Sequence, residues 1–156
     1  PKGVYGITKL AGELLIEHSG LDYVIIRPFT VIGEGGRKEM VLFKWLGQYQ
    51  RGEKITFHGD GSSFRGYTYV EDLIDGTIKS FKLSGVTLNL GGNQKVYLED
   101  LWKIFKEIYP DAERVTLPFP TYMEKGSMAD ISKTQELLNW QPETDIKKKI
   151  KELWTI

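Results

Sequence analysis

The sequence predicts an α/β protein with a parallel sheet, and three observations support this class. Short runs of apolar, often β-branched residues alternate with segments in which apolar residues recur at helical spacing. Two of the runs, YVIIRP at 23–28 and VTLNLGG at 86–92, are typical of strands that are covered on both faces. The chain has 156 residues and no internal repeat, which is enough for one domain with its own core.

The first elements follow from local patterns. Apolar residues recur at helical spacing from Ile7 to Leu15, so a helix is expected at 5–19, and Gly20 provides a stop. Pro28 ends the first strand, and the polar, glycine-rich loop after it is typical of the carboxyl end of a strand. The chain therefore begins with a helix, a strand and a loop.

The rest of the chain continues this alternation. A Gly-Asp-Gly sequence at 59–61 predicts a turn between two short strands. Ser132 and Gln135 have the spacing of a helix capping box, and Asp130 is expected to hold the loop before that helix. Helices are expected at 40–52, 70–83, 98–109, 132–140 and 145–154, and strands twice within 54–70, at 86–92 and from 114 onward.

The composition excludes several classes of partner. Lys and Arg together number 21, as do Asp and Glu, so neither nucleic acid nor an anionic membrane is favoured. The chain has no cysteine, which excludes disulfides and thiolate metal sites and fits a reducing compartment. Neither His18 nor His58 has a carboxylate at metal-ligand spacing, so no metal is expected. With no membrane span and no signal peptide in the sequence, we predict a cytoplasmic protein.

The first helix carries the first chemical candidate. Tyr5 and Lys9 are four residues apart, so both lie on one helix face. A tyrosine ionises at about pH 10, and an adjacent ammonium group favours the phenolate that a general base needs. The alternative interpretation is a packed tyrosine beside a lysine whose stem covers apolar surface.

Four segments occur in one order over nearly the whole chain. They are YGITKLAGE at 5–13, IIRPFTVIGEGGRKEMVLFKW at 25–45, GDGSSFRGYTYVEDL at 59–73 and ADISKTQELLNWQPET at 129–144. Together they resemble the C-terminal half of the NAD-dependent sugar epimerases and dehydratases, the extended short-chain dehydrogenase family. The stretch FTVIGEGGRKEM is most similar to the UDP-glucuronate 4-epimerase branch.

The resemblance implies the C-terminal half of a Rossmann-like, doubly wound parallel sheet together with a small α/β substrate-binding subdomain. Residues 1–156 would form a single region, in which 30–70 and 93–156 supply most of the substrate site. The N-terminal, cofactor-binding half would be absent, because neither Gly35-Gly36 nor Gly91-Gly92 forms a glycine-rich turn between a strand and a helix. We therefore expect the isolated chain to be inactive and to bind NAD weakly.

The resemblance also implies roles for residues near the cofactor. Tyr5 would be the catalytic acid/base. Lys9 would be its partner and would also contact the nicotinamide ribose. Pro28 and Phe29 would bring the end of a strand against the nicotinamide.

Three further residues are implied in substrate binding. Thr30 would donate a hydrogen bond to the sugar carboxylate, and Arg37 would hold a phosphate or the uronate with its planar fork. Arg65 is similar to the family arginine that binds the nucleotide diphosphate, although Gly66 stands where the family usually has an acid. The alternatives are a threonine that ends a strand and arginines that are solvated in loops.

The implied function is a nucleotide-sugar 4-epimerase that acts on UDP-glucuronate or on UDP-glucose and UDP-galactose. The sugar would be oxidised transiently at C4 by NAD, and hydride would return to the opposite face. Two alternatives remain: a decarboxylase or dehydratase of the same family, and a non-catalytic module that binds a nucleotide-sugar or a protein. The complete protein is expected to be a homodimer, because family members dimerise through the helix that bears the tyrosine and lysine.

Overall fold

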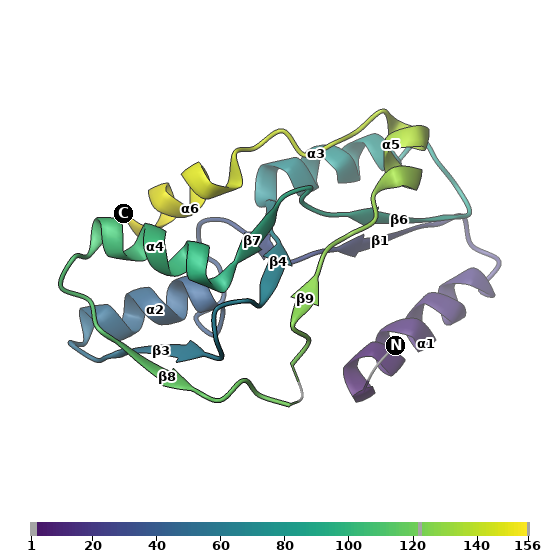
Figure 1. Cartoon of the computed structure of the whole chain (residues 1–156). Coiled ribbons are helices and arrows are strands. Elements are labelled where there is room, and N and C mark those ends of the chain that lie inside the picture. Colours follow the sequence, from purple (N-terminus) through teal and green to yellow (C-terminus); the bar gives the residue numbers. More distant parts are fainter. Residues whose placement is uncertain (1–2, 122, 156) are drawn as a thin grey trace.

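The computed structural model describes residues 3–121 and 123–155, and these form an α/β structure (Figure 1). The helices are α1 (Gly3–Glu17), α2 (Val41–Gln50), α3 (Val70–Ser80), α4 (Leu98–Ile108), α5 (Ser132–Leu138) and α6 (Ile146–Trp154). The strands are β1 (Val24–Pro28), β2 (Val31–Ile32), β3 (Ile55–His58), β4 (Phe64–Gly66), β5 (Thr68–Tyr69), β6 (Val86–Leu90), β7 (Lys95–Tyr97), β8 (Arg114–Leu117) and β9 (Gly126–Ser127). No helix among the described residues is long and apolar enough to cross a membrane.

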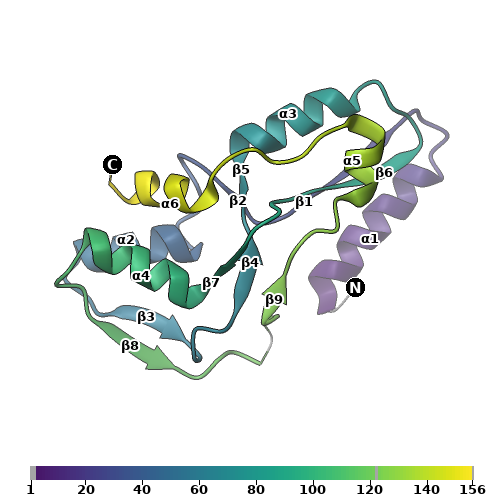
Figure 2. The same cartoon turned by 45° about the horizontal axis from the view of Figure 1, so that its top comes forward.

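The parallel pair β1–β6 is the Rossmann-like part of the molecule, with Val24 opposite Val86 at the start of the register. Helix α3 lies on one side of this pair and α1 on the other (Figures 1 and 2). Leu88 of β6 is fully buried and shares a core cluster with Trp140, which follows α5. Strand β1 is less covered, since Ile25 is its one buried residue. Both strands were expected to be covered on both faces, and β6 fits this expectation better than β1.

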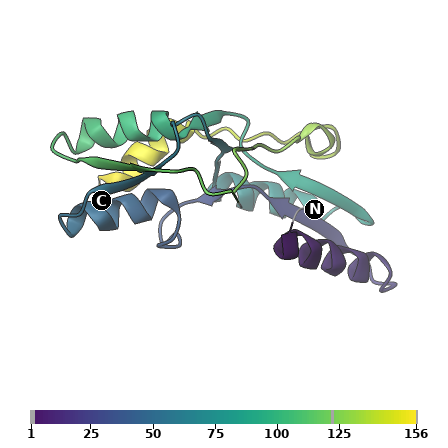
Figure 3. The ribbon, with the colours of Figure 1, turned by 60° about the horizontal axis from the view of Figure 1, so that its bottom comes forward.

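A second core lies at the other end of the molecule. There α2, α4 and α6 gather beside the parallel strand pair β3–β8 (Figures 1 and 3). The ring of Trp45 stacks on Trp154 with centroids 6.2 Å apart and meets the edge of Phe105 at 5.8 Å. The Trp45 indole N–H donates to the backbone carbonyl of Thr56 at 3.0 Å, and that of Trp154 donates to Leu42 at 2.8 Å. Buried aromatic residues from three helices thus hold this end together.

Short strands connect the two ends. Strand β4 pairs antiparallel with β7 and parallel with β9, while β2 pairs with β5. The Thr68 hydroxyl donates to the Phe29 carbonyl at 2.6 Å and accepts the Gly92 N–H at 3.0 Å. A Cβ on Gly92 would lie 1.8 Å from the carbonyl oxygen of Tyr67, so only glycine fits where these segments cross. The Gly91-Gly92 pair therefore serves a backbone crossing.

Helix α1 is attached differently from the other helices. None of its fifteen residues, all of which the structure describes, is buried. Its Glu13 carboxylate accepts a two-pronged hydrogen bond from Arg27 of β1, with Nε to Oε1 at 2.7 Å and Nη2 to Oε2 closer still. The side chains of Ile7 and Leu15 are 57% and 74% exposed. A polar contact and the loop at 18–23 thus link α1 to the sheet.

The structure corrects one detail of the sequence prediction and confirms another. The capping box at Ser132 is wrong, because Ser132 is the first helical residue and its N–H and hydroxyl both donate to the Asp130 carboxylate. Asp130 therefore holds the loop, as expected, and this contact lowers its pKa. The two short strands predicted around the Gly-Asp-Gly turn are confirmed as β3 and β4. In the sheets, β3 pairs with β8, and β4 pairs with β7 and β9.

Candidate active site

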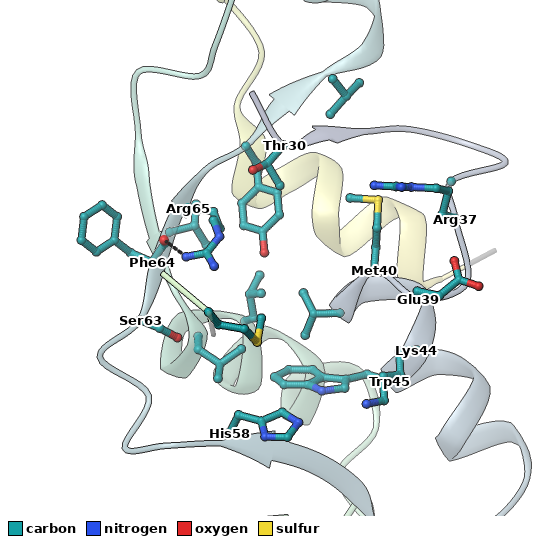
Figure 4. A pocket seen from close by; sticks show the side chains of 18 of the residues that line it. Thr30, Arg37, Glu39, Met40, Lys44, Trp45, His58, Ser63, Phe64 and Arg65 are labelled. Atoms are coloured by element: carbon teal, nitrogen blue, oxygen red, sulfur yellow. Dashed lines mark hydrogen bonds between the residues drawn. The ribbon is translucent and has the colours of Figure 1, made fainter. Parts of the chain in front are cut away.

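A cavity of about 890 Å³ lies beside the aromatic core and extends to the end of β1 and to α1 (Figure 4). Its walls include the end of β1, the loop at 33–40, the first turn of α2, strands β3 and β4, and the residues Phe119, Pro120 and Met123. No side chain caps the start of α2, so the positive end of its dipole lies at the cavity wall beside Met40. The charged lining residues are Arg37, Lys44, Arg65 and Glu39, an excess of cations that favours an anionic ligand.

Arg65 is fixed at the cavity wall by backbone carbonyls. Its Nη1 donates to Phe64 at 2.7 Å and to Lys125 at 3.5 Å, and its Nη2 donates to Glu124 at 2.9 Å. A guanidinium carries five N–H groups, so the Nε–H and a second hydrogen on Nη2 have no protein partner among the described residues. These two hydrogens are available to bind an oxyanion.

Gly66 stands where the family usually has an acid, and its surroundings explain why a glycine fits there. A Cβ at Gly66 would lie 3.0 Å from the Gly92 carbonyl oxygen and 3.3 Å from the Met128 side chain. The close crossing of β4 with the turn at 91–92 thus favours the smallest residue at this position. Arg65 is held by the backbone carbonyls at 64, 124 and 125.

Thr30 lies at the cavity in a strained conformation (Figure 4). Its φ is +28°, in a region that β-branched residues rarely adopt. Such a conformation costs on the order of 1–3 kcal/mol and persists where the surroundings enforce it. Here the Thr68 N–H donates to the Thr30 carbonyl at 3.1 Å, and the Thr68 hydroxyl holds the preceding residue. The strain therefore sits at the residue that sequence reasoning selected for the sugar carboxylate.

The loop at 33–40 carries Arg37 and is held at two points. The Tyr69 hydroxyl lies 3.2 and 3.4 Å from the two carboxylate oxygens of Glu34. Gly36 lies against Phe43, since a Cβ there would meet the ring at 2.0 Å. The Arg37 side chain lines the cavity beyond these two points (Figure 4).

Tyr5 reaches the same cavity from α1. Its side chain lines the cavity and is 76% exposed. The Lys9 ammonium lies 5.5 Å from the centre of the Tyr5 ring, as the one-face spacing predicts, but Lys9 does not line the cavity. The two groups are adjacent on an open surface at the cavity mouth.

Of the two residues after Arg27, only one lines the cavity. Pro28 lines the cavity, whereas Phe29 does not. The Phe29 N–H donates to Leu90 at 3.0 Å, and its Cβ lies close to Gly91, so Phe29 belongs to the β1–β6 side. Its contact with a cofactor stays a prediction.

The sequence of this chain matches a known protein family. The family model described as the NAD-dependent epimerase/dehydratase family matches residues 1–91. The chain is a member of this family. The match includes all of the residues predicted for the site, namely Tyr5, Lys9, Pro28, Phe29, Thr30, Arg37 and Arg65.

Individual members of the epimerase/dehydratase family are also similar. The UDP-glucuronate 4-epimerase of Thermodesulfobacterium geofontis is 36% identical over 158 residues, which cover 97% of this chain and 49% of that protein. The UDP-glucuronic acid 4-epimerase of Bacillus cereus, solved with UDP-glucuronic acid and NAD, has a TM-score of 0.87 at 29% identity, over 97% of this chain and 51% of the other. The UDP-glucose 4-epimerase of Thermotoga maritima, solved with UDP-glucose, has a TM-score of 0.88 at 26% identity, over 99% of this chain and 54% of the other. This chain thus spans about half the length of the relatives it matches.

The structure therefore brings Tyr5, Pro28, Thr30, Arg37 and Arg65 of this family member to one cavity. Asp72 and Lys125 do not line it. The Asp72 carboxylate instead accepts the backbone N–H groups of residues 143 and 144 at 3.2 and 3.4 Å.

Sequence reasoning missed three of the lining residues, Trp45, His58 and Tyr67. Trp45 and Tyr67 are mostly buried, and a sequence does not show which buried aromatic residue borders a cavity. Tyr67 lies between β4 and β5, outside either strand, so no strand repeat marks its side chain. Within 3–121 and 123–155 no group of three or more His, Asp or Glu side chains is arranged to hold a metal ion.

Proposed function

We propose that the full-length protein carrying this chain is an NAD-dependent epimerase that inverts C4 of a UDP-sugar, with UDP-glucuronate as its preferred substrate. The observation that carries the proposal is the convergence of Tyr5, Thr30, Arg37 and Arg65 on one cavity. Similar proteins named as UDP-glucuronate 4-epimerases support the same reaction.

Tyr5 is the proposed acid/base. It is exposed at the cavity mouth, so a sugar hydroxyl can reach its oxygen, and the Lys9 ammonium lies 5.5 Å from the centre of its ring. The phenolate takes the proton of the C4 hydroxyl and later returns a proton to the inverted alcohol. This residue performs the proton transfer in both directions.

The residues near Tyr5 fit one edge of the cofactor. Lys9 offers N–H donors for ribose hydroxyls, and Pro28 offers an apolar surface at the cavity. When bound, NAD⁺ supplies the acceptor for the C4 hydride. The pyrophosphate of such a cofactor is normally held by a glycine-rich turn at a helix N-terminus. None of the described helices begins with such a turn, so the chain offers only part of the cofactor site.

The other side of the cavity fits an anionic nucleotide-sugar. Arg65 has two N–H groups without a partner among the described residues, and the cationic lining supports binding of the diphosphate. Thr30 and Arg37 hold the sugar carboxylate. Oxidation of a uronate at C4 gives a β-keto acid, which loses CO₂ when the C–C bond stands perpendicular to the carbonyl plane. Hydrogen bonds that fix the carboxylate out of this orientation favour epimerisation over decarboxylation.

We also propose a cytoplasmic homodimer for the full-length protein. The exposed apolar side chains of α1, among them Ile7, Leu14 and Leu15, support a contact through this helix. The absence of cysteine from this chain fits a reducing compartment. Light scattering that gives a monomeric mass for the full-length protein would exclude the dimer.

The test is the product that the full-length protein forms from UDP-glucuronate and NAD⁺, followed by mass spectrometry and NMR. The expected product is UDP-galacturonate, of unchanged mass, and kcat/KM should be higher for UDP-glucuronate than for UDP-glucose. A product lighter by CO₂ would identify a decarboxylase instead. Conversion of neither sugar, with intact binding, would favour the non-catalytic module.

A further inference from the structure

Tyr67 has a hydroxyl group that the fold does not explain. The residue is 5% exposed and belongs to the core cluster around Trp45. Among the described residues, no hydrogen bond to its hydroxyl oxygen is present. Every fully buried polar side-chain atom there has a partner, so this oxygen is not fully buried. It therefore reaches the molecular surface, where a ligand can form a hydrogen bond with it.

The hydroxyl is directed to the cavity. Tyr67 lines the same cavity as Arg65 and Thr30, and its ring is otherwise surrounded by the core. Burial raises the pKa of Tyr67 to about 12, opposed by the positive charge of Arg65. The phenol is thus neutral at physiological pH and can donate a hydrogen bond.

The backbone on both sides of Tyr67 is fixed. Its carbonyl lies against Gly92, where a Cβ would be 1.8 Å away. The next residue, Thr68, bonds to both Phe29 and Gly92 through its hydroxyl. The ring therefore cannot leave the cavity wall without breaking the crossing that joins the two ends of the molecule. A fixed donor is what an efficient binding site requires, because little freedom is lost on binding.

We propose that the Tyr67 hydroxyl binds the substrate, donating a hydrogen bond to a diphosphate oxygen held by Arg65. This inference rests on the proposed function, since it takes the ligand to be a UDP-sugar. Tyr67 follows Arg65 by two residues, and both residues line the same cavity. An anion on the free Nε–H of Arg65 would also give the phenol the partner that it lacks.

The test is Tyr67→Phe in the full-length protein, with titration calorimetry against UDP and uridine. The substitution keeps the ring and removes only the oxygen. UDP binding should weaken by about 10-fold, whereas uridine binding should not change. The melting temperature should stay about the same, because the hydroxyl makes no hydrogen bond to the described residues. A residue with a merely structural role would not combine weaker binding with equal stability.

Tyr49→Phe is the matched control. The Tyr49 hydroxyl donates to Asp111 at 2.8 Å, and Tyr49 does not line the cavity. This variant should bind UDP as the wild type does and should not gain stability.

Each outcome of these titrations leads to a different conclusion. Equal UDP affinity of the wild type and Tyr67→Phe would overturn the inference and leave the proposed function intact. An equal loss for uridine and UDP would overturn the assignment to the diphosphate. Failure of the wild type to bind any UDP compound would overturn the proposed function, and the inference with it.

Discussion

The two ends of the molecule are held together in different ways. At the aromatic end, Leu101 and Phe105 of α4 are fully buried, and Trp45 contacts rings from three other segments. At the other end, α1 carries the two candidate catalytic residues and buries none of its side chains. The cavity lies between them, with Tyr5 on the weakly held side. Substrate binding is therefore expected to depend on the rigid end and proton transfer on the loosely packed helix.

The largest effect should come from Tyr5→Phe, which removes only the proton-transferring oxygen. Turnover by the full-length protein should fall by about 10²–10⁴-fold, the usual contribution of general acid–base catalysis. Stability should be unchanged, because the Tyr5 side chain is 76% exposed. Steady-state kinetics and thermal unfolding check the two halves of this prediction. Turnover of the Phe variant at the wild-type rate would show that Tyr5 is not the base.

The opposite pattern is expected for Trp45→Ala at the aromatic end. Trp45 is 1% exposed, so its removal leaves a cavity and should lower the unfolding free energy by about 3–5 kcal/mol. Leu15→Ala on α1 is the matched control, since this leucine is 74% exposed, and it should cost less than about 0.5 kcal/mol. Denaturant unfolding of the 156-residue chain measures both. Equal costs would mean that α1 is covered in solution by contacts other than those within the chain.

The sequence predicted the elements in which apolar residues recur at regular spacing over several turns. Helix α4 was expected at 98–109 and is found at Leu98–Ile108, because one face of it is apolar over three turns. Strands β2, β5, β7 and β9 have only two or three residues each, too few for a repeat to appear. They exist because neighbouring segments pair with them, which is a tertiary effect.

Site residues that belong to a sequence motif could be predicted. Site features that depend on how distant backbone segments pack together could not. Tyr5, Thr30, Arg37 and Arg65 follow from the resemblance to a family, and the cavity brings them together. The positive φ of Thr30 and the missing partner of the Tyr67 hydroxyl depend on the crossing at 66–68 and 91–92. Such a crossing joins segments far apart in sequence, so no local pattern reports it.

A smaller effect is expected for Thr30→Val on the rigid side of the cavity. Valine keeps the shape and the β-branch but removes the hydroxyl that would bind the carboxylate. The kcat/KM for UDP-glucuronate should fall by about 10-fold relative to UDP-glucose, since the lost hydrogen bond is to a charged group.

Thr30→Ser is the control for this variant, because it keeps the hydroxyl and should retain most of the activity on the uronate. Equal losses for the two sugars in Thr30→Val would exclude Thr30 as the uronate contact. Such a result would leave the epimerase proposal standing. Mass spectrometry of the product would also detect decarboxylation if the carboxylate is no longer fixed.

The smallest effect concerns the ion pair that attaches α1. The hydrogen bond from Arg27 lowers the pKa of Glu13 below its ordinary value of 4.5. Partial desolvation opposes this shift, and the attraction of the Arg27 charge adds to it. A carboxyl whose pKa is lower in the folded state stabilises that state fully above its unfolded pKa. This stabilisation is lost as the pH falls through the lowered pKa. Because the Arg27 side chain is 48% exposed, the loss should not exceed about 1 kcal/mol.

Hydrogen exchange, corrected for intrinsic rates, can separate the two ends. Below about pH 4.5, protection of the peptide 3–17 should fall by up to about fivefold, while that of α4 should not change. Glu13→Gln should remove this pH dependence, because it has no carboxyl to titrate. The same acid-induced loss in Glu13→Gln would mean that another group holds α1. Loss at both ends together would mean that the chain opens as one unit, and the contrast between a weakly held catalytic helix and a rigid binding wall would then fail.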